Sequence, residues 1–123
     1  MKIAQSDEIR ELAKTYIEAL HQHNIPLLSS LFHLDAALSG FMDGQYDHVP
    51  IARWIDQVKQ MPIQHKAQSE SEILRVDGSN EYIASVKLTH TFQGIHFLND
   101  LSLVKENERW LIIHKNFSGV YKL

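Results

Sequence analysis

The spacing of apolar residues changes halfway along the chain, from a helical period to the alternation typical of strands. Between Ile9 and Leu20 apolar side chains recur every three or four residues, which predicts a first helix running to about His23. Asn24 and Pro26 then break it and begin a short second helix. The apolar stripes of the two helices comprise Ile9, Leu12, Ala13, Tyr16, Ile17 and Leu20, followed by Leu27, Leu28, Leu31 and Phe32.

A third helix and a set of strands follow. Pro50 lies near the first position of the third helix and Pro62 ends it, with Ile51, Trp54, Ile55 and Val58 as its apolar stripe. Helices first and strands last, joined by hairpin-length connections, indicate an α+β domain in which helices cover an antiparallel sheet. A single domain over residues 1–123 is expected. The strands are predicted at about residues 35–41, 45–47, 66–76, 81–92, 95–105 and 109–120.

Two tight turns set a register for the long strands. If Gln93-Gly94 and Asn107-Glu108 are the central pairs of two-residue hairpins, facing residues can be counted out, although a slip of one residue would exchange the faces of one strand. The predicted inner rows are Ala84/Leu103/Ile112, Val86/Leu101/His114, Leu88/Asn99/Asn116 and His90/Phe97/Ser118. The predicted outer rows are Ile83/Val104/Leu111, Ser85/Ser102/Ile113, Lys87/Asp100/Lys115 and Thr89/Leu98/Phe117.

The outer rows carry more apolar area than a solvated sheet face needs. Exposed patches of this kind usually mark an interface, so a homodimer through the sheet is expected. The alternative is that the sheet curls and covers its own outer face. Asp100 is expected to pair with Lys87 and Lys115 on either side. The predicted dimer face comprises Leu98, Asp100, Val104, Leu111, Ile113, Lys115 and Phe117.

Composition excludes several classes of protein. The 123 residues include no cysteine, which rules out disulfides, a thiol nucleophile and zinc sites built on cysteine. A formal net charge of -3 without a basic run argues against nucleic-acid binding. No stretch has the apolar length to cross a bilayer, and residues 1–8 lack the apolar core of a secretory signal. A cytoplasmic protein without membrane contact is therefore expected.

Histidines are the main candidates for chemistry. His21 and His23 do not face each other on a helix, and His90 and His96 fall on opposite sheet faces, so no metal or other cofactor is predicted. His114 and His90 on the inner face are candidate general bases, because imidazole titrates near neutral pH. Ordinary buried histidines that hold backbone carbonyls are the alternative. Neither a Ser-His-Asp arrangement nor a Gly-rich phosphate loop is found.

Rings and a few polar groups predict a small-molecule pocket on the inner face. Such sites are generally apolar, with a small number of polar groups that fix the ligand. Core packing would account for many of the same rings. The predicted pocket residues are Phe32, Phe41, Trp54, Phe97, Asn99, Leu101 and Asn116.

The order of elements and three segments resemble the nuclear transport factor 2-like superfamily. The segments are residues 97–105 and 109–117, together with residues 32–36, and they are most similar to the putative lumazine-binding branch, close to SnoaL-like proteins. The resemblance implies a cone in which a strongly curved antiparallel sheet wraps a long N-terminal helix, with two shorter helices and a pocket between them. Members are commonly dimers. Some are isomerases, cyclases or dehydratases, and many have no assigned activity.

One residue departs from the pattern of that branch. Asn99 stands where the branch usually has aspartate, while Asp100 should point to the other face. Since asparagine cannot act as a general base, the sequence favours a protein that binds a small, mostly apolar ligand in the cone. Two alternatives stay open. One is an isomerase, cyclase or dehydratase that uses His114 or His90 as base, and the other is a non-catalytic dimeric interaction module.

Overall fold

The computed structural model describes residues 3–62, 70–78 and 80–121 and confirms the predicted order of elements. Predicted strand residues 66–69 lie outside the described residues. The elements are α1 (Ile3–His21), α2 (Ile25–Ser30), β1 (Phe32–Met42), β2 (Gln45–Pro50), α3 (Ile51–Gln60), β3 (Ser71–Asp77), β4 (Ile83–Phe92), β5 (Ile95–Glu106) and β6 (Arg109–Tyr121).

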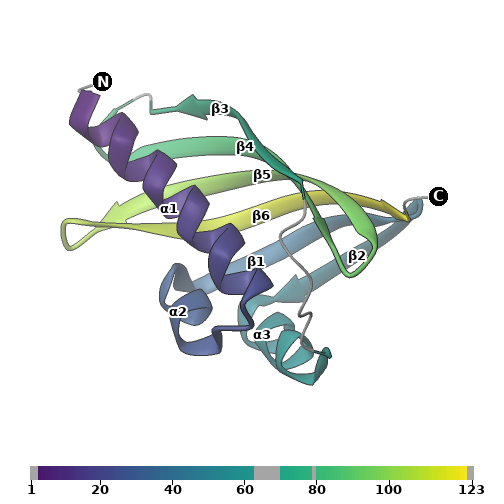
Figure 1. Cartoon of the computed structure of the whole chain (residues 1–123). Coiled ribbons are helices and arrows are strands. Elements are labelled where there is room, and N and C mark those ends of the chain that lie inside the picture. Colours follow the sequence, from purple (N-terminus) through teal and green to yellow (C-terminus); the bar gives the residue numbers. More distant parts are fainter. Residues whose placement is uncertain (1–2, 63–69, 79, 122–123) are drawn as a thin grey trace.

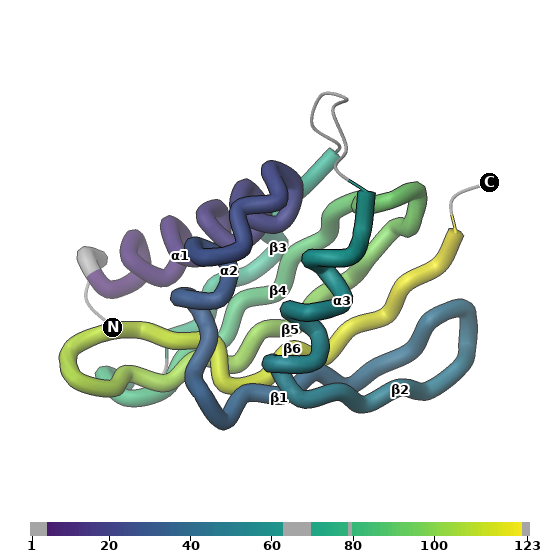
Figure 2. The backbone as a smooth tube through the Cα atoms, turned by 90° about the horizontal axis from the view of Figure 1, so that it is seen from below, coloured from purple at the N-terminus to yellow at the C-terminus, as the bar shows by residue number. Residues whose placement is uncertain are grey.

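The strands form one curved sheet that the helices cover on a single face (Figures 1 and 2). The strand order is β2-β1-β6-β5-β4-β3, and neighbours are antiparallel except that β1 runs parallel to β6. Helix α1 packs against β3 and β4, and α3 packs against β1 and β2. We call the covered side the inner face. No helix in the described part of the chain has the length and apolar character needed to cross a membrane.

The apolar residues predicted on one side of α1 pack against the inner face of the sheet. Ile9, Ala13 and Tyr16 have no exposed surface, since the helical period places them all on one side. In α2 the side chain of Asn24 accepts a hydrogen bond from the Leu27 backbone nitrogen and caps the helix start. Leu27 itself is exposed and Phe32 already belongs to β1, so these two residues do not extend the buried stripe of α2 as predicted.

The hairpin turns confirm the predicted register of β4 and β5. Gln93 and Gly94 have φ angles of 56° and 77°, the left-handed backbone that a tight hairpin turn requires. The flanking residues Phe92 and Ile95 pair directly. All the β4/β5 pairs counted out from the sequence follow, including Leu88 opposite Asn99 and His90 opposite Phe97.

A β-bulge in β6 overturns the predicted register of β5 and β6. Leu103 lies opposite Ile112 as predicted, but its neighbour Ser102 lies opposite His114, so Ile113 is the extra residue. Because side chains alternate along a strand, one extra residue exchanges the faces of all the residues after it. Lys115 and Phe117, predicted on the outer face, therefore lie on the inner face. His114, Asn116 and Ser118, predicted inside, lie on the outer face.

The bulge also removes the predicted ion pair partner of Lys115. Asp100 lies between Lys87 and Asn116 in the sheet, not between two lysines. Lys115 instead faces inward opposite Leu101, where its ammonium lies over the rings of Tyr16 in α1 and Trp54 in α3. This lysine, which the sequence placed on the surface, becomes part of the interior.

Candidate functional site

Aromatic rings from both helices and sheet gather on the inner face. Phe32 lies between Tyr16 and Trp54, with ring centroids 6.2 Å and 5.8 Å away. Phe97 stacks on His90 at 5.4 Å. Of the predicted site residues, the structure places six on the inner face or in its cover, namely His90, Phe32, Trp54, Phe97, Asn99 and Leu101.

Three predicted site residues lie elsewhere. His114 points outward because of the bulge, with its Nε2 2.9 Å from the Ser39 hydroxyl. Asn116 is exposed on the same side for the same reason. Phe41 is 48% exposed and packs on Tyr46 near the β1/β2 turn, because its position in β1 faces away from the helices. These side chains do not join the interior cluster.

The predicted dimer face is likewise reduced. Leu98, 41% exposed, remains on the outer face with the half-buried residues Asp100, Val104, Leu111 and Ile113. Lys115 and Phe117 are absent from it, since both point inward.

Lys115 is the interior residue that the sequence analysis missed. Only 4% of it is exposed, and its Nζ lies 4.3 Å from the ring centroid of Trp54. The rings of Tyr16, Phe97 and Phe117 surround it at 5.4 to 5.9 Å. Among the described residues no carboxylate forms an ion pair with it. Burial lowers the pKa of Lys115 to about 7, although the surrounding ring faces favour the ammonium ion.

Tyr16 and Asn99 form the polar part of the cluster. The Tyr16 hydroxyl lies 3.1 Å from Asn99 Oδ1, and both side chains are fully buried. Burial raises the pKa of Tyr16 above its ordinary value, so the phenol stays protonated. Its hydroxyl therefore donates a hydrogen bond to Asn99 Oδ1. The amide nitrogen of Asn99 then points elsewhere, and no described residue lies within hydrogen-bond distance of it, although the side chains of Asn99 and His90 interact.

His90 completes the cluster on the neighbouring strand. Its Nδ1 lies 3.1 Å from His21 Nε2, while its own Nε2 has no partner in the described part of the chain. Burial is the main cause that lowers the pKa of His90 to about 3, and the nearby charge of Lys115 adds to it. The imidazole is therefore neutral at physiological pH and a weak base.

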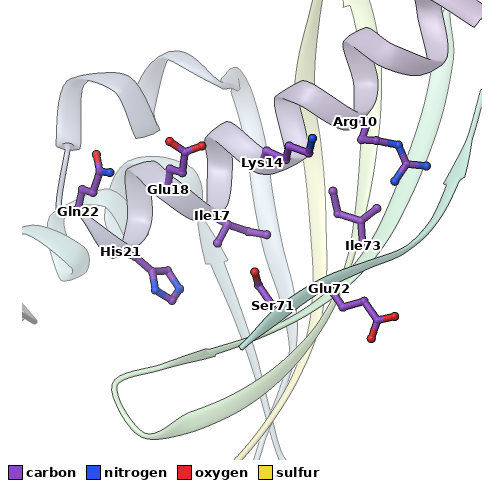
Figure 3. Close-up of a pocket in the computed structure, with 9 residues that line it drawn as sticks. All are labelled: Arg10, Lys14, Ile17, Glu18, His21, Gln22, Ser71, Glu72 and Ile73. Atoms are coloured by element: carbon purple, nitrogen blue, oxygen red, sulfur yellow. The ribbon is translucent and has the colours of Figure 1, made fainter. Parts of the chain in front are cut away.

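His21 connects this cluster to a groove between α1 and β3 (Figure 3). The groove has a volume of about 530 Å³, and charged side chains of both signs surround its apolar floor. Local sequence patterns do not predict this groove, because it depends on how the edge strand β3 packs against α1. The lining residues are Arg10, Lys14, Ile17, Glu18, His21, Gln22, Ser71, Glu72 and Ile73.

Comparison with known proteins finds the same fold in a family match and in solved structures. Residues 4–118 match the family described as "Putative lumazine-binding". An NTF-2 like protein of unknown function from Silicibacter pomeroyi DSS-3 superposes with a TM-score of 0.85 at 18% identity, covering 97% of this chain and 99% of that one. A ketosteroid isomerase-like protein from Erwinia carotovora superposes with a TM-score of 0.75 at 16% identity, covering 96% and 98%.

A relative in sequence has a named activity. The aldolase FrzH of Cladobotryum sp is 22% identical over 114 residues, which cover 93% of this chain and 90% of the aldolase. Identities this low show a shared fold, and the chemistry must be argued from the side chains.

Proposed function

Because this chain belongs to the putative lumazine-binding family of nuclear transport factor 2-like proteins, we propose that it binds a small, flat, mostly apolar ligand with a carbonyl group inside the cone. The site comprises Lys115, Asn99 and Tyr16 with the rings of Trp54 and Phe97.

A buried amide donor without an acceptor, together with a buried lysine that has no described carboxylate partner, carries this proposal. The amide nitrogen of Asn99 has no partner among the described residues, and the ammonium of Lys115 has no carboxylate. A buried donor left unpaired costs about 1–3 kcal/mol. A ligand oxygen that accepts from both groups would offset that cost in the complex. Carbonyl oxygens are such acceptors.

The rings around the donors favour a flat, apolar body for the ligand. Trp54, Phe97 and Phe117 present apolar surface to the same lysine, and aromatic faces bind planar groups by stacking. The family description names lumazine, a flat heterocycle with carbonyl groups. The sequence relative is named an aldolase, and aldol reactions act on carbonyl compounds. Both names are consistent with a ligand that carries a carbonyl group, and this agreement supports the same kind of ligand for this chain.

The acid–base alternative has less support in the side chains. His90 is the inner-face histidine, and its pKa of about 3 makes it a poor proton acceptor at neutral pH. His114 lies on the outer face, and the amide of Asn99 cannot act as a general base. Neither histidine therefore has the position and basicity that the isomerase, cyclase or dehydratase alternative requires of its base.

Lumazine itself is a suitable first probe. We expect the variant Lys115→Met to raise the Kd for lumazine about tenfold or more, because a hydrogen bond from a charged donor contributes about 1.5–3 kcal/mol. Isothermal titration calorimetry measures this directly. Lys105→Met is the matched control, since Lys105 also lies over a tryptophan ring, that of Trp110, but outside the site. Equal affinity of the wild type and Lys115→Met contradicts the proposal.

A further inference from the structure

We propose that Lys115 is a nucleophilic amine that forms a covalent imine with an aldehyde or ketone in the cone. The inference rests on the proposed function, since the carbonyl group that is bound is also the group that reacts. Beyond ligand binding, it assigns Lys115 the role of nucleophile and names imine formation as the reaction.

The surroundings of Lys115 differ from those of the other lysines. Lys14 and Lys59 are exposed and lie 3.5 Å and 3.9 Å from the carboxylates of Glu11 and Asp56. Lys115 is buried among rings, and no described carboxylate pairs with it. An amine must lose its proton before it can attack carbon, and burial among apolar rings without a described carboxylate favours that neutral form.

The neighbours of Lys115 can hold the carbonyl in place. Lys115 pairs across the sheet with Leu101, two positions along β5 from Asn99 and on the same face. The hydroxyl of Tyr16 fixes the oxygen of the Asn99 amide, which leaves its nitrogen as a donor without a partner in the described residues. A carbonyl oxygen that accepts from this nitrogen is polarised, which makes its carbon more open to attack.

The reaction balances with water as the proton source and product. The lone pair of the neutral amine attacks the carbonyl carbon, so a C–N bond forms while the C=O π electrons move to oxygen. A proton then passes from nitrogen to this oxygen to give a carbinolamine. A second proton, taken from a solvent water molecule that is left as hydroxide, converts the hydroxyl into a leaving water molecule, and the nitrogen lone pair forms the C=N bond. The product is a protonated imine.

The ring cage also suits the product. A protonated imine is a cation on the same nitrogen, and aromatic faces attract cations without transferring a proton from them. The centroid of Trp54 lies 4.3 Å from this nitrogen and that of Phe117 lies 5.8 Å away. The ring faces attract the imine cation as they attract the ammonium ion, so the product is stabilised without a carboxylate counter-ion.

Reductive trapping with acetone tests the covalent step. The full-length protein is incubated with acetone and sodium borohydride near neutral pH, and peptide mass spectrometry locates the added isopropyl group. We expect at least about tenfold more modification at Lys115 than at Lys14, Lys59 or Lys105, because Lys115, unlike the other three, is buried among rings, and burial lowers its pKa. Modification spread over the exposed lysines without enrichment at Lys115 overturns the proposal.

Two variants and a competition complete the experiment. Lys115→Met should lose the preferred adduct while Lys105→Met keeps it, and prior addition of lumazine should slow trapping at Lys115. The mapping on wild-type protein decides the question even if a variant folds poorly. If lumazine binds in a Lys115-dependent way but trapping fails, the covalent proposal is wrong and the binding proposal stands. If trapping at Lys115 succeeds but the Kd for lumazine is the same in the wild type and Lys115→Met, the binding proposal is wrong and the covalent proposal stands.

Discussion

A single lysine buried among rings is the side chain on which the proposed chemistry depends. Folding removes Lys115 from water and gives it four ring faces but no described carboxylate. Burial without an ion pair disfavours the charged form of an amine, so the fold carries an electrostatic cost at this position. An apolar side chain of similar length would avoid that cost, which indicates that the lysine serves a purpose other than stability.

The pH dependence of stability should reveal the burial of Lys115. Its pKa is about 7 in the folded protein and 10.5 in the ordinary state, so between these values the unfolded chain binds a proton that the folded chain does not. The free energy of unfolding therefore rises with pH across this window, by about 1.4 kcal/mol for each pH unit at most. Below pH 7 Lys115 is protonated in both the folded and the unfolded protein, so the folded protein bears the full free-energy cost of burying its charge.

The measurement is urea unfolding of the wild type and Lys115→Met between about pH 6 and pH 9. We expect Lys115→Met to be the more stable protein at the acidic end, with the difference shrinking as pH rises. Lys105→Met should follow the wild-type curve. Parallel curves for the wild type and Lys115→Met would show that the lysine keeps its ordinary pKa in the fold.

At the scale of elements, the contact between β1 and β6 shapes the site. The two strands run parallel, and Gly40 lies opposite Phe117, whose ring is part of the lysine cage. A Cβ atom at Gly40 would lie 1.9 Å from the backbone oxygen of Phe117, far inside any real contact. The chain needs glycine here because the backbones approach each other too closely for a side chain.

Alanine substitutions at two glycines of this region should differ in cost. Gly40→Ala forces two backbones apart, so we expect a loss of about 3 kcal/mol or more in the free energy of unfolding. Gly119→Ala meets mainly side-chain atoms, Phe97 Cε1 at 2.7 Å and Met42 Sδ at 2.9 Å, which can shift, so about 1 kcal/mol is expected. Chemical denaturation of both variants compares them. A smaller loss for Gly40→Ala than for Gly119→Ala would contradict the argument.

At the scale of the whole molecule, the uncovered face of the sheet stays a predicted dimer interface. Leu98 and Ile83 are 41% and 52% exposed there, beside the half-buried Val104 and Leu111. The bulge adds His114 and Asn116 to this side, which makes it more polar than the sequence predicted. The remaining apolar residues still form a patch that a second copy of the chain would cover by sheet-to-sheet packing.

Mass measurement in solution tests the dimer. We expect a dimer at micromolar concentration by light scattering, and a shift toward monomer in Leu98→Glu, because a buried charge without a partner opposes association. Leu34→Glu is the control, since Leu34 is 94% exposed and lies outside the predicted dimer face. A monomeric mass for the wild-type protein at this concentration would contradict the predicted dimer.

The sequence by itself determined the helices, most strands and the hairpins, because these depend on local periodicity and turn residues. The helical stripe of α1 and the turn at Gln93-Gly94 are determined by residues that lie close together in the sequence. They fixed the β4/β5 register, and with it the inward positions of Asn99 and His90. The likeness to the family also followed from these local segments.

The tertiary structure alone decided the identity of the reactive side chain. The apolar run Trp110–Ile113 has no alternation that could locate an extra residue, so the bulge at Ile113 was invisible to a periodic count. A weak signal did exist beyond it, since His114, Asn116 and Ser118 alternate as a polar face should. The bulge arises where β6 pairs with β5 on one side and in parallel with β1 on the other, and this non-local pairing turned Lys115 inward.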